Sequence, residues 1–388
     1  MPLSGVKVVE VGMNLAGPLA GAIMADLGAD VIKVERPETG DDARAWGPPF
    51  VEDTSLPFHN MNRNKRSVVI DFKDTADMGR LYQLIEQADV FLHNLRPGVA
   101  EQVGLEADLL LSRNPTLVYC GVTAFGHTGP LKDKPGYEVL LQAFGGLMSM
   151  TGQENGPPVR MGTSVVDYGT GMWTAIAALA ALRKRDKTGR GCIVTTSLFE
   201  TAVFYVSTAL IQYKKTGKAP ARHATGSPRQ VAFGAFETQN GPLVLGVANS
   251  RLFFKLAKAL GREEWVTDPR YQTNADRMEH RGYLIQEIAA HMAQETKETW
   301  MERLEAVGVP CAPILTIPEV IAQPQTQALD MIREVPGSAL EVMGLPFSIN
   351  GQRPDFRSRA PQLGEHTDEV FNPRFPNDKK LASPQSEK

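Results

Sequence analysis

One carboxylate, Asp167, stands out because of the sequence around it. It precedes Gly169 and Gly171 and leads into an apolar, Ala-rich run from Met172 to Leu182 that predicts a buried helix. A carboxylate just before such a helix could act as a nucleophile, and exposed NH groups at the glycines could stabilise an oxyanion. The alternative is an ordinary N-cap aspartate. This stretch alone leaves both interpretations open.

Basic residues near the start of the chain could bind a phosphate or a carboxylate. Arg36 and Arg44 lie in a loop over 36–59 that is rich in Gly, Pro and Asp and too broken for a regular element. Lys73 lies at the far end of a strand predicted within 62–74, where an α/β sheet can place a phosphate contact. The alternative for the two arginines is a solvated charge or an ion pair with a neighbouring aspartate.

Composition narrows the class of protein. The 388 residues are 42% hydrophobic and 22% charged, and 41 basic against 44 acidic side chains leave a net charge of −3. This composition is typical of a soluble protein of two domains, and without a basic run it gives no reason to expect nucleic acid or an acidic membrane as partner. The longest predicted apolar helix is shorter than the roughly 20 residues that cross a bilayer, so we expect no membrane span.

The N-terminus and the cysteines indicate the compartment. MPLSGVKVVEVG enters a strand pattern directly and lacks the basic and apolar regions of a secretory signal. Cys120, Cys192 and Cys311 form neither a disulfide framework nor a CxxC pair, and the seven histidines are scattered. We therefore expect a cytoplasmic protein without a metal site.

Strand and helix patterns alternate through the first half of the chain. A strand at 6–11, a helix at 16–27 and a strand at 30–35 form a βαβ unit. Further strands are predicted within 62–74 and at 88–94, 117–125 and 192–197, with helices at 76–88, 137–150, 172–182 and 198–213. The alternation predicts an α/β fold with a doubly wound parallel sheet.

Because of the βαβ unit at 6–35, an NAD-dependent oxidoreductase is an alternative function for this chain. Its second strand ends in Glu35, about where a ribose-binding acid would lie. The glycines fall at Gly12, Gly17 and Gly21, and this spacing departs from GxGxxG, which argues against a dinucleotide.

The pattern changes near Lys214, where a basic, Gly- and Pro-rich stretch predicts a linker. Short strands at 233–238 and 243–247 flank Asn240-Gly241, a hairpin signal, and three helices follow. We expect a large domain over 1–213, a linker over 214–232, a small α+β domain over 233–316 and a disordered tail over 377–388.

Ten segments, in order, resemble the family III CoA-transferases, also called the carnitine dehydratase and bile-acid-inducible protein family. They cover essentially the whole chain and are AGPLAGAIMADLGADVIKVERP, GDDARAWGPPF, NRNKRSVVIDFK, ADVFLHNLRPG, GHTGP, GYEVLLQAFGGLMSMTG, the Asp167 segment, KTGRG, GVPCAPI and LGEHTDEV. Ten ordered segments are more specific than any one motif. GDDARAWGPPF and TGQENGPPVR look most like the succinate–hydroxymethylglutarate CoA-transferase branch.

The resemblance implies a Rossmann-like large domain, a small domain, a return of 317–376 to the large domain, and a homodimer of two interlocked chains. It implies CoA transfer in which Asp167 attacks an acyl-CoA thioester, giving a mixed anhydride and then an aspartyl-CoA thioester. Acyl-CoA and a carboxylic acid are then the substrates, and no tightly bound cofactor is required. NH groups near Gly169 or in the GHTGP loop are candidates for oxyanion support.

Eight positions match CoA contacts of the family, and they are Asn14, Leu15, Arg36, Ile70, Lys73, Asn94, Leu95 and Tyr137. Arg36 and Lys73 would meet phosphates. Two features depart from the family pattern. Gln102 stands where some members have a basic residue, and GSPRQVAF at 226–233 replaces the glycine-rich loop of formyl-CoA transferases, which argues against formyl and oxalyl substrates.

The same family includes α-methylacyl-CoA racemases, which exchange an α-proton with a His and an Asp. Their aspartate matches Asp167, but their histidine falls at Tyr137, and the ordinary tyrosine pKa of about 10 is too high for a base near neutral pH. Transfer is therefore favoured, and a non-enzymatic CoA-binding protein is a third alternative, against which Asp167 argues. A dicarboxylate substrate would need a cation for its second carboxylate, and Arg44, Arg160 and Arg222 are the candidates.

Overall fold

The computed structural model of this protein describes residues 1–372, so the predicted tail over 377–388 lies outside the described residues. The chain forms two compact units. The first comprises Met1–Gly146, Met161–Thr208 and the chain from Leu329 onward, and the second comprises Leu147–Arg160 and Ala209–Ala328. The sequence placed the corresponding boundaries at 213 and 317 and did not set 147–160 apart.

A sheet of six parallel strands forms the centre of the first unit, in the order β5-β2-β1-β6-β7-β8. The strands are β1 (Lys7–Val11), β2 (Asp30–Glu35), β5 (Lys65–Val69), β6 (Val90–His93), β7 (Val118–Thr123) and β8 (Cys192–Ser197). Most of β1, β2, β6 and β7 is buried on both faces, which explains their nearly continuous apolar sequences. The predicted doubly wound parallel sheet is confirmed.

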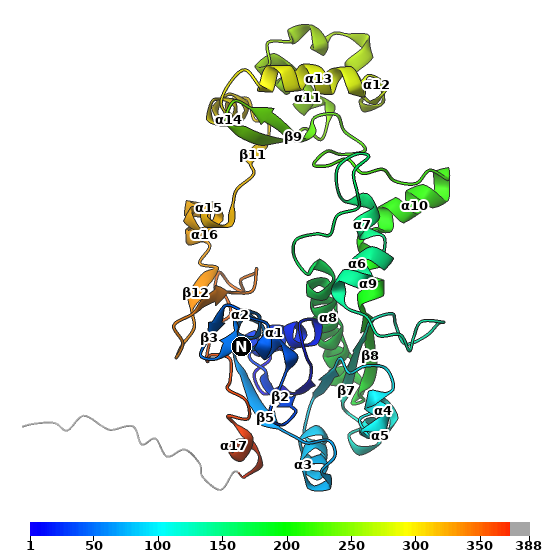
Figure 1. Cartoon of the computed structure of the whole chain (residues 1–388), viewed down its shortest axis with the longest axis vertical. Helices are drawn as coiled ribbons and strands as arrows, with labels where there is room; N and C mark the ends of the chain where they lie inside the picture. The colour runs from blue at the N-terminus through cyan, green and yellow to red at the C-terminus, as the bar shows by residue number, and fades with distance from the viewer. Residues whose placement is uncertain (373–388) are drawn as a thin grey trace, which may run out of the picture. The chain divides into compact units, whose positions relative to one another are not determined.

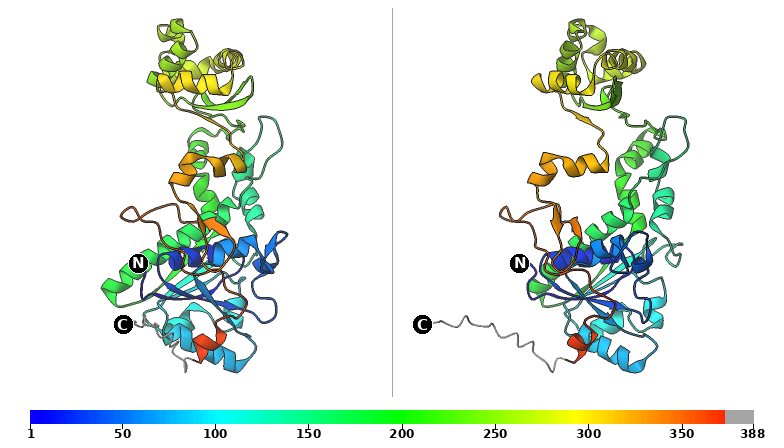
Figure 2. Two further views of the ribbon diagram at one scale, coloured as in Figure 1. Left: turned by 90° about the vertical axis from the view of Figure 1, so that its left-hand side faces the viewer. Right: turned by 60° about the vertical axis from the view of Figure 1, so that its left-hand side comes forward.

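Helices cover both faces of this sheet (Figure 1). On one face lie α1 (Ala16–Asp26) and α8 (Val165–Thr188), and on the other lie α3 (Thr75–Glu86), α4 (Val99–Gln102) and α5 (Ala107–Arg113). Figure 2 shows the same layers from two further sides. The core between the sheet and α3 to α5 includes Phe91, Leu81 and Leu110, all fully buried.

The loop over 36–59 is more regular than its sequence indicates. It contains the short helix η1 (Asp42–Ala45), the strand pair β3 (Phe50–Val51) and β4 (Thr54–Ser55), and the start of α2 (Leu56–Asn62). Ser55 begins α2 by accepting a hydrogen bond from the backbone NH of Phe58. The prediction of an irregular loop was wrong because local capping, rather than apolar periodicity, forms these elements.

Two predicted helices are each divided in the structure. The helix expected at 137–150 consists of α6 (Glu138–Phe144) and α7 (Leu147–Met150), separated by Gly145 and Gly146, and Gly146 has a positive φ. The helix expected at 198–213 consists of α9 (Leu198–Tyr205) and α10 (Ser207–Thr216).

The helix α8 is longer than predicted. Its 24 residues reach the length and apolar composition of a helix that could cross a membrane, which the predicted run over 172–182 did not. Half of its most apolar window is buried inside the protein, and α8 packs against α1, β7 and β8. This burial is typical of the core helix of an α/β protein. The cytoplasmic location stays a prediction.

The second unit contains a three-stranded antiparallel sheet in the order β11-β10-β9, with β9 (Phe233–Thr238), β10 (Gly241–Gly246) and β11 (Cys311–Pro313). The hairpin expected at Asn240-Gly241 is present. The accompanying helices are α11 (Ser250–Ala259), η2 (Glu263–Val266), η3 (Pro269–Tyr271), α12 (Asn274–Glu279), α13 (Arg281–Met292), α14 (Lys297–Ala306), α15 (Ile317–Ala322) and α16 (Pro324–Ala328). Phe253, Trp265 and Trp300 lie in the core that the sheet forms with the helices from α11 to α14.

The chain after Leu329 packs on the first unit. It forms the strand pair β12 (Ile332–Glu334) and β13 (Glu341–Met343) and ends in α17 (Thr367–Phe371). The NH of Asn64 donates to the Ser358 carbonyl at 3.2 Å, and the NH of His366 donates to the Ser67 carbonyl at 2.9 Å. This part of the chain therefore lies beside the edge strand β5.

Candidate active site

Asp167 lies in the first turn of α8. The helix begins at Val165 with Ser164 as its N-cap, so Asp167 is the third helical residue, and it is half-buried. The N-cap interpretation of Asp167 was therefore wrong, because the helix begins before it. In the first turn the peptide dipoles favour a negative charge, which suits a carboxylate that acts as a nucleophile.

Gly169 and Gly171 allow other helices to approach α8 closely. A Cβ atom on Gly169 would lie 1.9 Å from Tyr205 Oη on α9, and one on Gly171 would lie 2.8 Å from the backbone oxygen of Ala16 on α1. Both glycines lie inside α8, beyond the NH groups that a helix leaves unbonded at its start. The NH groups of Gly169 and Gly171 themselves are therefore used within the helix, and oxyanion support from the NH groups of the preceding turn stays a prediction.

The contact between α8 and α1 orients Asp167. Residues four apart share a helix face, so Asp167 lies on the same face as Gly171 and about 6 Å nearer the helix start. Gly171 packs against Ala16, the first residue of α1. Asp167 therefore lies on the side of α8 that faces α1.

Two buried side chains of α6 hold the segment that enters α8. Gln142 Nε2 donates to Glu138 Oε1 at 2.6 Å, and Glu138 Oε1 also accepts from the NH of Val166 at 3.5 Å. Gln142 Oε1 accepts from the NH of Met161 at 2.9 Å. Sequence reasoning missed both residues, although a Glu and a Gln four residues apart in the apolar run EVLLQAF were a usable signal.

The strand order reverses between β1 and β6, which is the topological switch point of the sheet. Strands β2 and β5 lie on one side of β1, and strands β6, β7 and β8 lie on its other side. Open α/β sheets bind ligands beyond the carboxyl ends of the strands at this point. Asn14 and Leu15 follow β1, and Asn94 and Leu95 follow β6. The fold thus brings four of the predicted CoA contacts together at the place where a ligand is expected.

Asn94 is a structural bridge across this point. Its Oδ1 accepts from the NH of Met13 at 2.8 Å, and its Nδ2 donates to the Met13 carbonyl at 2.7 Å. A Cβ atom on Gly17 would lie 3.2 Å from the Asn94 side chain, so the small residue at 17 leaves room for this bridge. Asn94 therefore orients the turn after β1 as well as lying beside it.

The other predicted CoA contacts lie at the same edge of the sheet. Arg36 follows β2, is about half exposed and forms an ion pair with Asp42. Lys73 is exposed just beyond β5, and Tyr137 is exposed immediately before α6. Ile70 is buried, so only its backbone can face a ligand.

Arg44 is engaged within the protein. Its guanidinium donates to the Glu35 carboxylate at 2.7 and 2.8 Å and to the Pro361 carbonyl at 3.1 Å, and it lies 3.8 Å from the centre of the Phe58 ring. Burial alone would raise the pKa of the Glu35 carboxyl, but hydrogen bonds from Arg44 and the charge of Lys33 hold it below its ordinary value. The Glu35 carboxylate is in turn bonded to Arg44, so it is not placed to bind a ribose.

Arg222 and Arg160 lie in the second unit. Arg222 donates to the backbone carbonyl of Ser149 in α7 and to those of Gln153 and Gly156 in the turn that follows α7. Its guanidinium therefore organises this turn. Arg160 is exposed and lies seven residues before Asp167 in the chain.

His93, at the end of β6, supports Leu95. The NH of Leu95 donates to His93 Nδ1 at 3.4 Å, so Nε2 carries the hydrogen and donates to Tyr119 Oη at 2.8 Å. Tyr119 in turn donates to the Leu105 carbonyl at 3.1 Å. Burial, with a smaller effect of His127, lowers the pKa of His93 to about 4, so the ring is neutral. Sequence reasoning missed this network.

The GHTGP loop follows β7, and the NH of Gly126 donates to Thr123 Oγ1 at 3.0 Å. Gln102 is exposed at the end of α4. Among residues 1–372, no group of three or more His, Cys, Asp or Glu side chains could hold a metal ion.

Comparisons with known proteins agree with this geometry. The chain matches the model of CoA-transferase family III over residues 3–367. It is 36% identical to the succinate–glutarate CoA-transferase of Agrobacterium fabrum, over 95% of both chains, and 36% identical to the acetyl-CoA:oxalate CoA-transferase of Acetobacter aceti, over 94% of this chain and 93% of that one.

A CAIB/BAIF family protein from Brucella suis has a similar structure, with a TM-score of 0.84 and 35% identity over 95% of this chain and 98% of the other. The oxidoreductase and non-enzymatic alternatives are therefore not retained. The chain belongs to CoA-transferase family III and is a CoA-transferase.

Proposed function

We propose that this transferase carries the acyl group on Asp167. The observation that supports this most is the place of Asp167 in the first turn of α8, on the face that packs against the helix following the switch-point turn. The carboxylate adds to the carbonyl carbon of the donor thioester, the C–S bond breaks, and a mixed anhydride and CoA thiolate result. The thiolate then attacks the Asp167 carbonyl and displaces the donor acid, leaving an aspartyl-CoA thioester.

The second half repeats these steps with the acceptor. An acceptor carboxylate attacks the aspartyl thioester, releases the thiolate and forms a second anhydride. The thiolate attacks the acceptor acyl carbon, forms the new acyl-CoA and returns Asp167 as a carboxylate. Each anhydride retains the free energy of the thioester, so neither a nucleotide nor a metal is needed.

Coenzyme A binds across the switch point in this proposal. The backbone and side chains of Asn14, Leu15 and Leu95 contact the ligand, and Tyr137 contacts it from the start of α6. Arg36 and Lys73 meet phosphates as charge-assisted partners, with Arg36 exchanging Asp42 for a phosphate. Ile70 takes part through its backbone, and Asn94 takes part through the turn that it holds.

The preferred acids are dicarboxylates in this proposal. Succinate and glutarate appear in the name of one relative, and oxalate appears in the name of another, so oxalate belongs among the acids to test despite the altered loop at 226–233. Arg160 is the candidate for the second carboxylate, because its side chain is exposed in the segment that leads directly into α8, seven residues before Asp167.

The functional form is a homodimer, interlocked as in the family that the chain resembles. One chain alone leaves an apolar surface on α8 and α9 exposed, and this α8–α9 surface consists of Met172, Trp173, Ile176, Phe204 and Tyr205. The rings of Trp173 and Phe204 lie edge to face with their centres 5.2 Å apart. An exposed apolar surface of this kind marks an interaction site.

Trapping the acyl-enzyme tests the proposed chemistry. The protein is incubated with succinyl-CoA, treated with hydroxylamine or borohydride, and the modified residue is located by peptide mass spectrometry. A hydroxamate or an alcohol at Asp167 is the expected result. Exchange of α-deuterium in an α-methylacyl-CoA without any adduct would instead favour the racemase reaction.

A further inference from the structure

The turn over Gly12–Leu15 has a conformation that the surrounding side chains must hold. Asn14 has a φ of 68°, in the left-handed region that costs a residue with a side chain about 1 kcal/mol or more. Three consecutive residues of the turn are fixed from outside. Lys33 Nζ donates to the Gly12 carbonyl at 2.6 Å, Asn94 bridges the NH and carbonyl of Met13, and Asp41 Oδ1 accepts from the NH of Asn14 at 2.9 Å.

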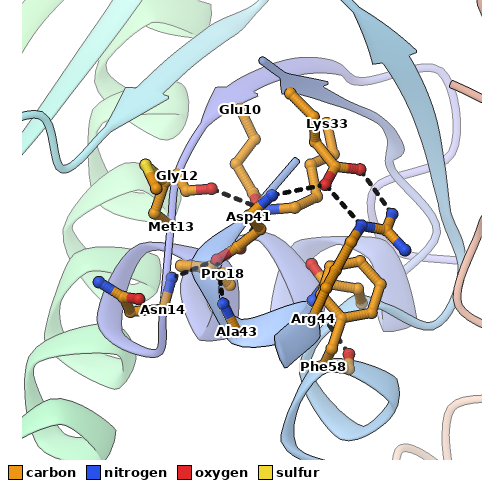
Figure 3. Close-up of polar contacts among 12 residues, drawn as sticks. Glu10, Gly12, Met13, Asn14, Pro18, Lys33, Asp41, Ala43, Arg44 and Phe58 are labelled. Atoms are coloured by element: carbon orange, nitrogen blue, oxygen red, sulfur yellow. Dashed lines mark hydrogen bonds and ion pairs between the residues drawn. The ribbon is translucent and has the colours of Figure 1, made fainter. Parts of the chain in front are cut away.

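Two of these side chains form a buried ion pair (Figure 3). Lys33 Nζ lies 2.8 Å from Asp41 Oδ2, and both side chains are fully buried. At this distance the two charged groups are in direct contact. Lys33 also contacts Glu10 at 3.2 Å, and Glu10 contacts Lys65 at 2.8 Å. Two lysines and two carboxylates therefore balance one another beneath the turn.

The lysine stays charged in this setting. Burial alone would lower the pKa of Lys33, but the carboxylates of Asp41, Glu10 and Glu35 more than offset burial and raise it above its ordinary value. Glycine at 21 makes room for the cluster, because a Cβ atom there would lie 1.7 Å from Glu10 Oε2. This explains Gly21 without a dinucleotide.

Stability alone does not explain the Lys33–Asp41 pair. Well-packed apolar residues usually stabilise a core as much as a buried ion pair does. Apolar side chains could not, however, bond the Gly12 carbonyl or the Asn14 NH, and each charged partner makes one of these bonds. The pair therefore specifies the conformation of the turn.

Asp41 also connects the turn to the loop that carries Arg36. Its Oδ1 accepts from the NH of Ala43 at 2.9 Å and so begins η1, and its own NH donates to Glu35 Oε2 at 2.9 Å. One carboxylate thus anchors both the turn after β1 and the loop after β2. These are the two segments that meet CoA in the proposed function.

We propose that Lys33 and Asp41 are positioning residues that preset the Gly12–Leu15 turn for the CoA ester. This inference rests on the proposed binding of CoA at the switch point. The pair touches no substrate, and its effect on binding comes through the turn.

A set of matched variants separates positioning from stability. Lys33→Met and Asp41→Asn each leave an unbalanced buried charge and should lower Tm, whereas the double variant restores the balance and should recover much of the Tm. The double variant still lacks the donor to the Gly12 carbonyl. We therefore expect its Kd for CoA and its KM for succinyl-CoA to stay raised about tenfold or more, with kcat changed much less.

The control is the pair of Arg63 and Asp26, which is also buried in the first unit but holds the C-terminal segment rather than the turn. The double variant Arg63→Met/Asp26→Asn should keep the native Kd for CoA. If the Lys33/Asp41 double variant regained the native Kd along with its Tm, or matched the control, the proposal would be overturned.

A measurement on the unaltered protein does not depend on the variants folding. Hydrogen exchange without ligand should show the amides of Met13 and Asn14 protected at least about 100-fold despite their place in a turn, since the Met13 NH donates to the half-buried Asn94 and the Asn14 NH donates to the buried Asp41. Exchange at the unprotected rate would overturn the proposal. This result differs from failure of the proposed function, which would appear as the absence of CoA binding to the unaltered protein.

Discussion

At the scale of single residues, the structure separates arginines that look equivalent in the sequence. Arg44 pairs with Glu35 and packs on Phe58, whereas Arg160 is exposed seven residues before Asp167. Arg44 has the contacts of a structural residue, because removing its side chain would leave the Glu35 carboxylate buried without its main partner. Arg160 is the arginine that we propose for the second carboxylate of the substrate.

The variants Arg160→Gln and Arg44→Gln test this distinction. Arg160→Gln should raise KM for glutarate about tenfold or more while leaving KM for butyrate nearly unchanged, since only glutarate has a second carboxylate to lose its partner. Arg44→Gln should lower the free energy of unfolding by about 3 kcal/mol or more. Equal effects of Arg160→Gln on both acids would contradict the assignment.

His93 predicts a pH dependence of stability. Its folded pKa is about 4, below the ordinary value of 6.5, so between these pH values the unfolded chain binds more protons. The contribution of His93 is complete above pH 6.5 and is lost as pH falls toward 4, by up to roughly 3 kcal/mol. Denaturant unfolding at several pH values should show this slope, and it should be smaller in His93→Gln. An unchanged slope in that variant would contradict the buried, neutral ring.

At the scale of elements, the close packing of α8 on α1 and α9 is what places Asp167. The contact partner of Gly171 is a backbone oxygen, which cannot rotate away as a side chain can. A methyl group at this position must therefore separate the two helices. Gly79, in the exposed part of α3, has no atom within 4 Å of its ideal Cβ and provides a matched comparison.

Gly171→Ala should therefore destabilise the protein by about 1–3 kcal/mol and should also lower kcat, because Asp167 moves with α8. Gly79→Ala should raise the free energy of unfolding by up to about 1 kcal/mol and leave kcat unchanged. Thermal unfolding and initial rates on both variants check this. A native kcat in Gly171→Ala would show that the packing does not orient Asp167.

Many of the helices and strands could be predicted from the sequence. The strands over 30–35 and 192–197 matched because both segments are rich in β-branched residues and each follows a glycine-containing break in the helical pattern. The start of α8 was missed because TSVVDYGTG contains β-branched residues and glycines, which reduce helix propensity, whereas tertiary contacts decide the outcome. The roles of Lys33, Asp41 and His93 could not be predicted, since each depends on at least one partner more than 20 residues away, namely Gly12 for Lys33, Asn14 for Asp41 and Tyr119 for His93.

At the scale of the whole molecule, the apolar α8–α9 surface indicates assembly. Phe204 and Ile176 are more than half exposed in a single chain, and the Phe204 ring lies against the Trp173 ring. A soluble monomer rarely keeps such side chains together in water. A second copy of the chain is the partner that the family resemblance implies.

Substituting this surface should shift the assembly toward monomers. Phe204→Glu combined with Ile176→Glu would place charges in the proposed interface, and sedimentation velocity at micromolar concentration should then show a mass near 42.4 kDa in place of twice that value. Asp186→Asn, at the other end of α8, serves as the control. A native protein that is already monomeric would contradict the homodimer.

The transfer of CoA from succinyl-CoA to glutarate by Asp167→Asn tests the central claim most directly. Asp186→Asn lies on the same helix with its side chain about half exposed, and it should keep the native rate. If Asp167 carries the acyl group, Asp167→Asn should lower kcat by about 1,000-fold or more while still binding CoA. Transfer by Asp167→Asn at a rate close to that of Asp186→Asn would show that the acyl group travels by another route.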